Sequence, residues 1–198
     1  MIRLIIFDMD GVLIDSADAW HSIFNSALEH FDGRRISREE FDRKVWARDF
    51  DITAKRYFSA KPEEVREYFT QIYKNFRKKL SAFPDIKSTL GKLRGKGLKL
   101  AVATNTHTEN AVQMLSDSGI ANFFDTVFGA DKARNGKPEP DMLIKIMKEL
   151  GLGKEESVFI GDTIYDKMAA EKAGIRFIGM RLGKGERIDS LAEILPMV

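Results

Sequence analysis

The sequence predicts an α/β protein whose doubly wound parallel sheet carries an all-helical insertion after its first strand. Short apolar runs alternate with helical patterns over most of the 198 residues, as strands and crossover helices do in a parallel sheet. Residues 17–80 contain helical patterns and no strand-like run. We therefore expect a core domain formed by residues 1–16 and 81–198 and a helical cap domain formed by residues 17–80.

The first element that we expect is a buried strand over residues 2–7, because this apolar run is rich in isoleucine and ends at charge and glycine. From residue 17 onward, large apolar residues recur at the three-and-four spacing of a helix. Ser37 and Glu40 have the spacing of a capping box that opens a second helix. Pro62 suits the first position of another helix, since proline needs no amide donor there.

Beyond residue 80 strands and helices alternate again, which is typical of a parallel sheet with helices on both faces. The expected strands are residues 98–103, 126–128, 157–160 and 175–179. The expected helices are residues 86–93, 109–116, 140–150, 165–173 and 188–195.

Composition excludes several classes of site and partner. The chain has no cysteine, so disulfides, thiolate catalysis and cysteine-based zinc sites are excluded. The first apolar run ends at Asp8, too early for a signal peptide or a membrane span. The net charge is +2, with no dense basic run interleaved with aromatic residues. We expect a cytoplasmic protein with neither a membrane nor a nucleic-acid partner.

Two carboxylates, Asp8 and Asp10, stand at the carboxyl end of the first expected strand. Ligands of open α/β sheets bind just outside this end of the strands. Burying two unpaired carboxylates there costs several kcal/mol or shifts their pKa values, and a bound cation removes that cost. The pair indicates a nucleophile and an acid/base group over a divalent metal. The alternative is a helix N-cap followed by an Asp-Gly turn.

Three further polar clusters follow later strands, and the sheet should gather them at the same edge. Each is a weak signal alone, because a hydroxyl or an aspartate after a strand is often only a cap or a turn. The clusters are Thr104-Asn105-Thr106, Lys137 in a loop rich in glycine and proline, and Gly161-Asp162-Thr163 with Asp166.

Taken in order, these four motifs resemble those of the haloacid dehalogenase (HAD) superfamily of phosphotransferases. The resemblance spans residues 8 to 166, and the insertion is similar to the small helical cap of the phosphoglycolate phosphatase and β-phosphoglucomutase branch. It implies a Rossmann-like core with Mg²⁺ as the cofactor.

The resemblance also implies catalytic roles. Asp8 would be the nucleophile that becomes an aspartyl phosphate, and Asp10 the general acid and base. Thr104, the backbone N–H of Asn105 and Lys137 would bind the phosphoryl oxygens and stabilise the charge that develops during transfer.

The same resemblance implies a metal site. Asp8, the backbone carbonyl of Asp10 and Asp162 would hold Mg²⁺, a hard cation that prefers oxygen ligands. Asp166 would support the site from outside or orient Lys137. Gly11 would let the chain turn away sharply after the pair.

In the expected cap, His21 could face a substrate, although a lone histidine is more often packed or on the surface. A set of basic residues in the expected cap could also contact a substrate. For most of them, a position on a solvated helix face is favoured. They are Arg34, Arg35, Arg43, Lys44, Arg48, Lys55 and Arg56.

The function that we expect is a Mg²⁺-dependent phosphatase, similar to phosphoglycolate phosphatase, that hydrolyses a small anionic phosphorylated metabolite. A sugar phosphomutase with the same core is the first alternative, and a non-catalytic ligand-binding module is the second. A dehalogenase is disfavoured, because the family's dehalogenases lack the carboxylate that Asp10 supplies. We expect a monomer or a homodimer.

Overall fold

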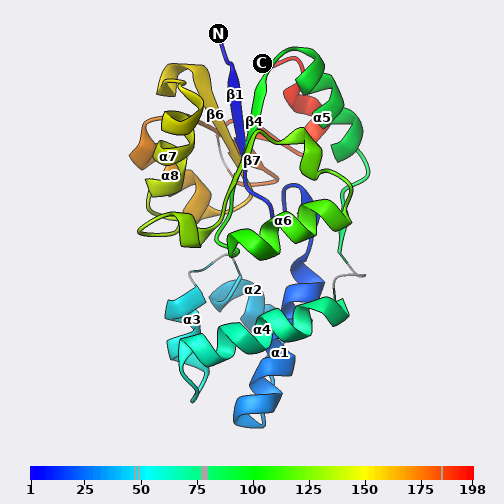
Figure 1. Cartoon of the computed structure of the whole chain (residues 1–198), viewed down its shortest axis with the longest axis vertical. Helices are drawn as coiled ribbons and strands as arrows, with labels where there is room; N and C mark the ends of the chain where they lie inside the picture. Colours follow the sequence, from blue (N-terminus) through cyan, green and yellow to red (C-terminus); the bar gives the residue numbers. More distant parts are fainter. Residues whose placement is uncertain (47, 49, 77–79, 184) are drawn as a thin grey trace. The chain divides into compact units, whose positions relative to one another are not determined.

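The computed structural model divides into two compact units (Figure 1). The core unit comprises Met1–Asp15 and Ala82–Val198, and the helical unit comprises Ser16–Ser81. The structure describes residues 1–46, 48, 50–76, 80–183 and 185–198.

The described residues of the core unit form a six-stranded sheet in the order β5-β4-β1-β6-β7-β8, and every neighbouring pair is parallel. The chain begins at β1 in the middle, moves outward through β4 and β5, and returns to the other side of β1 with β6. This reversal beside β1 is the switch point at which such sheets bind ligands. The strands are β1 (Leu4–Phe7), β4 (Lys99–Ala103), β5 (Thr126–Phe128), β6 (Ser157–Gly161), β7 (Arg176–Met180) and β8 (Arg187–Ile188).

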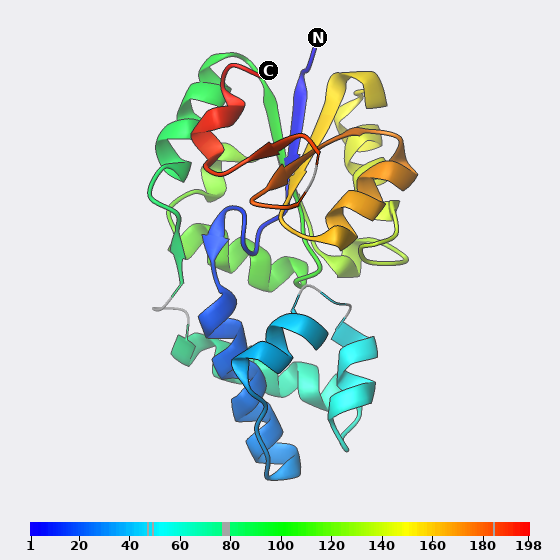
Figure 2. The same cartoon turned by 180° about the vertical axis from the view of Figure 1, so that it is seen from behind.

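Helices cover both faces of the sheet, as the sequence predicted. All four residues of β1 are fully buried, which explains its unbroken apolar run. Leu4 and Ile6 share a core cluster with residues of α7 and α8, and these helices lie on one side of the sheet while α5 and α6 lie on the other (Figures 1 and 2). The helices are α5 (Ile86–Gly95), α6 (Thr108–Asp117), α7 (Asp141–Leu150) and α8 (Ile164–Ala173).

The expected helix over residues 188–195 is wrong in part. Residues Arg187–Ile188 form β8, which pairs with β7, and only Leu191–Ile194 are helical, as the 3₁₀ helix η5. The Asp85 carboxylate accepts hydrogen bonds from the Ser190 hydroxyl and the Ala192 amide. Contacts with β7 and with Asp85 therefore determine the structure of residues 187–194.

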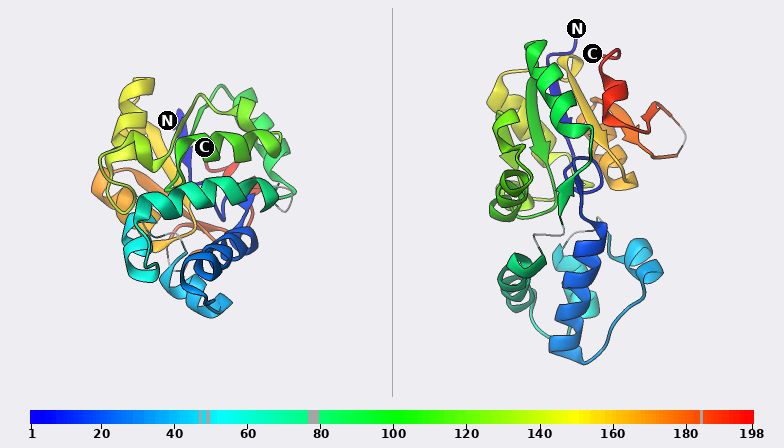
Figure 3. Two further views of the ribbon diagram at one scale, coloured as in Figure 1. Left: turned by 60° about the horizontal axis from the view of Figure 1, so that its bottom comes forward. Right: turned by 90° about the vertical axis from the view of Figure 1, so that its right-hand side faces the viewer.

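The described residues of the helical unit form four helices: α1 (Ala17–Asp32), α2 (Arg38–Lys44), α3 (Phe50–Tyr57) and α4 (Pro62–Phe76). Trp20 stacks on Tyr73 and His30 on Tyr68, so α1 and α4 pack against each other, and they cross at an angle (Figure 3). Ser37 caps α2 by accepting a hydrogen bond from the Glu40 amide, as its position predicted.

At the two places where the chain passes between the units, the short strands β2 (Ile14–Asp15) and β3 (Ser81–Ala82) pair with each other. Among the described residues, no helix combines the length and the apolar character that spanning a membrane requires.

Candidate active site

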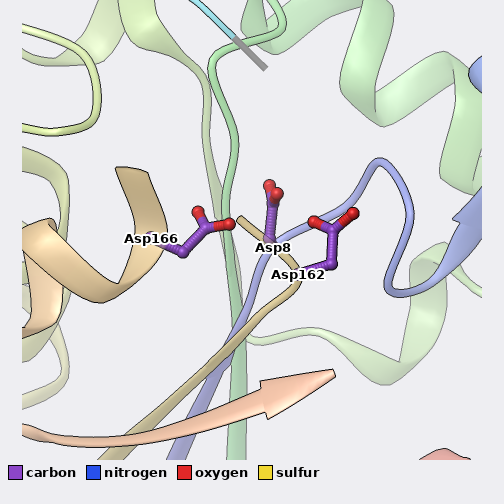
Figure 4. Close-up of side chains that lie close together, drawn as sticks. All are labelled: Asp8, Asp162 and Asp166. Carbon is purple, nitrogen blue, oxygen red and sulfur yellow. The ribbon is translucent and has the colours of Figure 1, made fainter. Parts of the chain in front are cut away.

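The loops that follow β1 and β6 bring three carboxylates together at the carboxyl edge of the sheet. Phe7 at the end of β1 is in register with Ile160 of β6, so Asp8 and Asp162 emerge from neighbouring strands. Asp166 comes from the first turn of α8. One oxygen of each of the three side chains lies within 4.8 Å of the others (Figure 4).

Lys137 lies between two of these carboxylates. Its Nζ is 2.6 Å from Asp8 Oδ1 and 2.7 Å from Asp166 Oδ1, and all three side chains are buried. Burial by itself would lower the pKa of Lys137, but the charges of Asp166 and Asp8 outweigh it and raise that pKa above its usual value. Lys137 therefore stays protonated.

One lysine does not balance three acids, and the pKa values of two of them, Asp8 and Asp162, are raised. Burial, reinforced by Asp166, raises the pKa of Asp8 well above its usual value despite the opposing effect of Lys137. Burial and the charge of Asp166 likewise raise the pKa of Asp162 to about 7. The cluster has a deficit of positive charge.

The donor set fits a hard divalent cation. Among the described residues, Asp162 Oδ1 is a buried atom without a hydrogen-bond partner, and buried polar atoms are rarely left so. Carboxylate oxygens are the ligands that Mg²⁺ and Ca²⁺ prefer. A cation beside Asp8 and Asp162 would supply the missing charge and satisfy the orphaned oxygen.

Asp166 has other partners. Besides Lys137, its Oδ2 accepts hydrogen bonds from the Thr163 amide (3.0 Å) and hydroxyl (2.5 Å), which closes a capping box at the start of α8. These bonds favour the supporting role expected for Asp166: orienting Lys137.

Asp10 is held by two hydroxyl groups that follow β4. Thr106 Oγ1 lies 3.0 Å from Asp10 Oδ2, and Thr104 Oγ1 lies 3.4 Å from the same oxygen. The Thr106 amide in turn donates to Thr104 Oγ1 over 3.1 Å. Sequence reasoning gave Thr106 no role, and the only signal for it was its place in the Thr-Asn-Thr run.

The Asn105 side chain braces the lysine loop. Its Nδ2 donates to the Lys137 carbonyl over 3.0 Å, and the Lys137 amide donates to its Oδ1 over 2.8 Å. A Cβ at Gly136 would lie only 2.7 Å from that Oδ1. The side chain of Asn105 thus positions Lys137, a contact that sequence reasoning missed while it considered only the backbone N–H.

Gly11 makes a close approach that no other residue could make. Its φ is +80°, and a Cβ would lie 2.2 Å from Asp162 Oδ2. Its carbonyl accepts a 2.6 Å hydrogen bond from Arg181, whose guanidinium also lies 4.7 Å from the centre of the Phe83 ring. No sequence signal pointed to Arg181, because it is 170 residues away.

The candidate residues of the helical unit have partners within that unit. His21 Nε2 lies 2.9 Å from Asn25 Nδ2 and 3.2 Å from the Ile36 carbonyl, which favours a packed histidine. Four of the seven basic candidates are engaged by neighbours: Arg34 donates to the Tyr57 carbonyl, Arg35 to Glu29, Lys44 to Glu40 and Arg48 to the Arg43 carbonyl.

The chain matches the haloacid dehalogenase-like hydrolase family over residues 5–180, and it belongs to that family. The phosphoglycolate phosphatase of Yersinia pseudotuberculosis is 32% identical over 191 residues, covering 92% of this chain and 82% of the relative. That of Escherichia coli strain K12 is 29% identical over 215 residues, covering 95% and 85%.

A crystal structure from Lactobacillus plantarum, described as a putative phosphoglycolate phosphatase, shares the fold with a TM-score of 0.89 over the full length of both chains at 17% identity. The family match and the phosphatase relatives confirm the predicted class of enzyme, a phosphatase. The particular proteins to which the chain is similar are phosphoglycolate phosphatases.

Proposed function

We propose that this protein is a Mg²⁺-dependent phosphatase that hydrolyses a small phosphorylated metabolite through an aspartyl phosphate on Asp8. The observation that carries the proposal is the buried Asp8 carboxylate, 2.6 Å from Lys137 and grouped with Asp162. Phosphoglycolate is the first substrate to test, because curated relatives about 30% identical are named for it.

Asp8 is the nucleophile. Its carboxylate oxygen forms a bond to phosphorus while the bond from phosphorus to the leaving oxygen breaks. The nearby ammonium group of Lys137 offsets the repulsion between this carboxylate and an anionic substrate. Mg²⁺, held by Asp8, Asp162 and the Asp10 carbonyl, would supply the remaining positive charge for the carboxylates and the phosphoryl oxygens.

Asp10 moves the protons of both half-reactions. It gives its proton to the leaving oxygen as the Asp8–phosphorus bond forms, and then takes a proton from the water that attacks the aspartyl phosphate. In that second step the bond from the water oxygen to phosphorus forms and the bond between phosphorus and the Asp8 oxygen breaks. Asp8 is thereby regenerated.

Thr104, the backbone N–H of Asn105 and Lys137 bind the phosphoryl oxygens. The buried position of Thr104 beside Asp10 and the bracing of Lys137 by Asn105 support this assignment. Donors that are fixed in place before the reaction stabilise the developing charge at little cost in reorganisation.

The test is phosphate release from a panel of monoesters that includes 2-phosphoglycolate and hexose phosphates, with Mg²⁺ and with EDTA. We expect turnover with Mg²⁺ and none with EDTA or in Asp8→Asn. Asp117→Asn, an exposed aspartate at the end of α6, is the matched control and should keep wild-type activity. Release without metal, or release that survives Asp8→Asn, would overturn the proposal. Isomerisation of a hexose 1-phosphate with little free phosphate would favour the mutase alternative.

A further inference from the structure

Thr106 is the member of the Thr104-Asn105-Thr106 run that the mechanism above leaves without a role. It lies half-buried just beyond the carboxyl end of β4. Its hydroxyl is 3.0 Å from Asp10 Oδ2, a normal distance for a bond between a hydroxyl donor and a carboxylate. Thr106 therefore touches the group that transfers the proton.

The contact from Thr104 to the same oxygen is longer, at 3.4 Å. Thr104 Oγ1 also accepts a hydrogen bond from the Thr106 amide. Of these two hydroxyl contacts, the Thr106 bond is the shorter and the stronger constraint on Asp10 Oδ2. The Thr106 bond therefore fixes the position of the Asp10 carboxyl group.

We propose that Thr106 is a positioning residue that holds the Asp10 carboxyl group in place for proton transfer to the leaving oxygen. The proposal rests on the role of Asp10 in the proposed phosphatase mechanism. Loss of the Thr106 hydroxyl should impair protonation of the leaving group and should leave binding of the phosphoryl group unchanged.

Substrates with different leaving groups distinguish a role of Thr106 in leaving-group protonation from a general structural role. An alkyl phosphate needs a proton on its leaving oxygen, whereas p-nitrophenyl phosphate releases a stable anion and needs little help. The ratio kcat/KM covers the steps up to formation of the aspartyl phosphate, so it reports leaving-group protonation without the later attack of water.

The experiment compares Thr106→Val, which removes the hydroxyl and keeps the shape, with Thr106→Ser, which keeps the hydroxyl. The substrates are p-nitrophenyl phosphate and the alkyl phosphate of the panel that the wild type hydrolyses fastest, with 2-phosphoglycolate tried first. We expect Thr106→Val to lower kcat/KM about tenfold for the alkyl phosphate and to stay within about twofold for p-nitrophenyl phosphate. Thr106→Ser should restore most of the loss.

Two controls complete the design. Thr70→Val removes a hydroxyl bonded to a backbone carbonyl in α4 and should change neither ratio. In an Asp10→Asn background, Thr106→Val should cause no further loss with the alkyl phosphate, because the proton is no longer there to be positioned.

Equal losses on both substrates, or a rise in KM alone, would overturn the proposal in favour of a phosphate-binding or structural role. Full loss in Thr106→Ser would overturn it as well. A wild-type protein that hydrolyses no phosphate monoester would instead overturn the proposed function, so the two failures are distinguishable.

Discussion

Replacing Gly11 with alanine tests how tightly the loop after β1 packs against Asp162. Gly11 has a φ of +80°, a conformation that costs a residue with a Cβ about 1–2 kcal/mol. The new Cβ would lie 2.2 Å from Asp162 Oδ2, and Cβ contacts below 3.0 Å essentially do not occur. The carboxylate must therefore retreat by about 0.8 Å.

Gly97→Ala is the matched control. Gly97 has a φ of +79°, and nothing lies within 4 Å of the position that a Cβ would occupy there. Gly97→Ala should lose about 1–2 kcal/mol of stability, or a few degrees in Tm, and Gly11→Ala should lose at least as much, because its Cβ also displaces a carboxylate. Only Gly11→Ala should displace Asp162, and a misplacement near 1 Å can cost about 100-fold in rate.

The assay pairs thermal unfolding with a titration of activity against Mg²⁺. We expect both variants to melt a few degrees lower, with kcat/KM down about 100-fold and a higher Mg²⁺ requirement in Gly11→Ala alone. If Gly11→Ala matches Gly97→Ala in both kcat/KM and Mg²⁺ requirement, the close approach of Gly11 to Asp162 does not constrain the site.

Three further predictions concern charge and strain in the core unit. Lys137→Met removes the cation between the buried side chains of Asp8 and Asp166 and should cost about 3–5 kcal/mol at about pH 8. The cost should be smaller at about pH 5, because burial raises the pKa of Asp8 and its protonated form needs no counter-ion; equal losses in urea unfolding at the two pH values would contradict this. Because the pKa of folded Asp162 is raised from 3.8 to about 7, the folded state binds its proton more tightly, so stability in EDTA should fall as pH rises from about 4 to about 7. Protons and Mg²⁺ compete, so the gain in Tm from Mg²⁺ should grow over the same interval, and Asp162→Asn should flatten both trends. Arg181 has a φ of +55°, so Arg181→Gly should be more stable than Arg181→Ala by about 1 kcal/mol in urea unfolding, and equal stabilities would count against strain at this position.

Local patterns were sufficient to predict the class of the fold. The apolar run over residues 2–7 predicted a buried strand, and residues Leu4–Phe7 are fully buried in β1. The spacing of Ser37 and Glu40 predicted the start of α2. Such signals are carried by consecutive residues, so they can be read without knowing the rest of the structure.

Local sequence patterns did not predict the structure where contacts with other segments of the chain decide it. Residues 188–195 have a helical pattern, yet pairing with β7 and capping by Asp85 limit the helix to Leu191–Ile194. The residues around Asn105 predict only a loop. The hydrogen bonds between its side chain and the Lys137 carbonyl and amide depend on how that loop meets the loop that contains Lys137.

The sequence by itself determined the chemistry available to this protein: acids after β1 and β6, hydroxyls after β4 and a lysine in a loop, in the order typical of its family. The tertiary structure decided how these groups meet. The register between β1 and β6 places Asp8 and Asp162 at one edge, Lys137 comes to lie between Asp8 and Asp166, and Thr106 reaches Asp10. The sequence specifies which residue types are present. Remote side chains come within about 3 Å of one another only when the sheet and its loops pack, and the pKa shifts follow from those short distances.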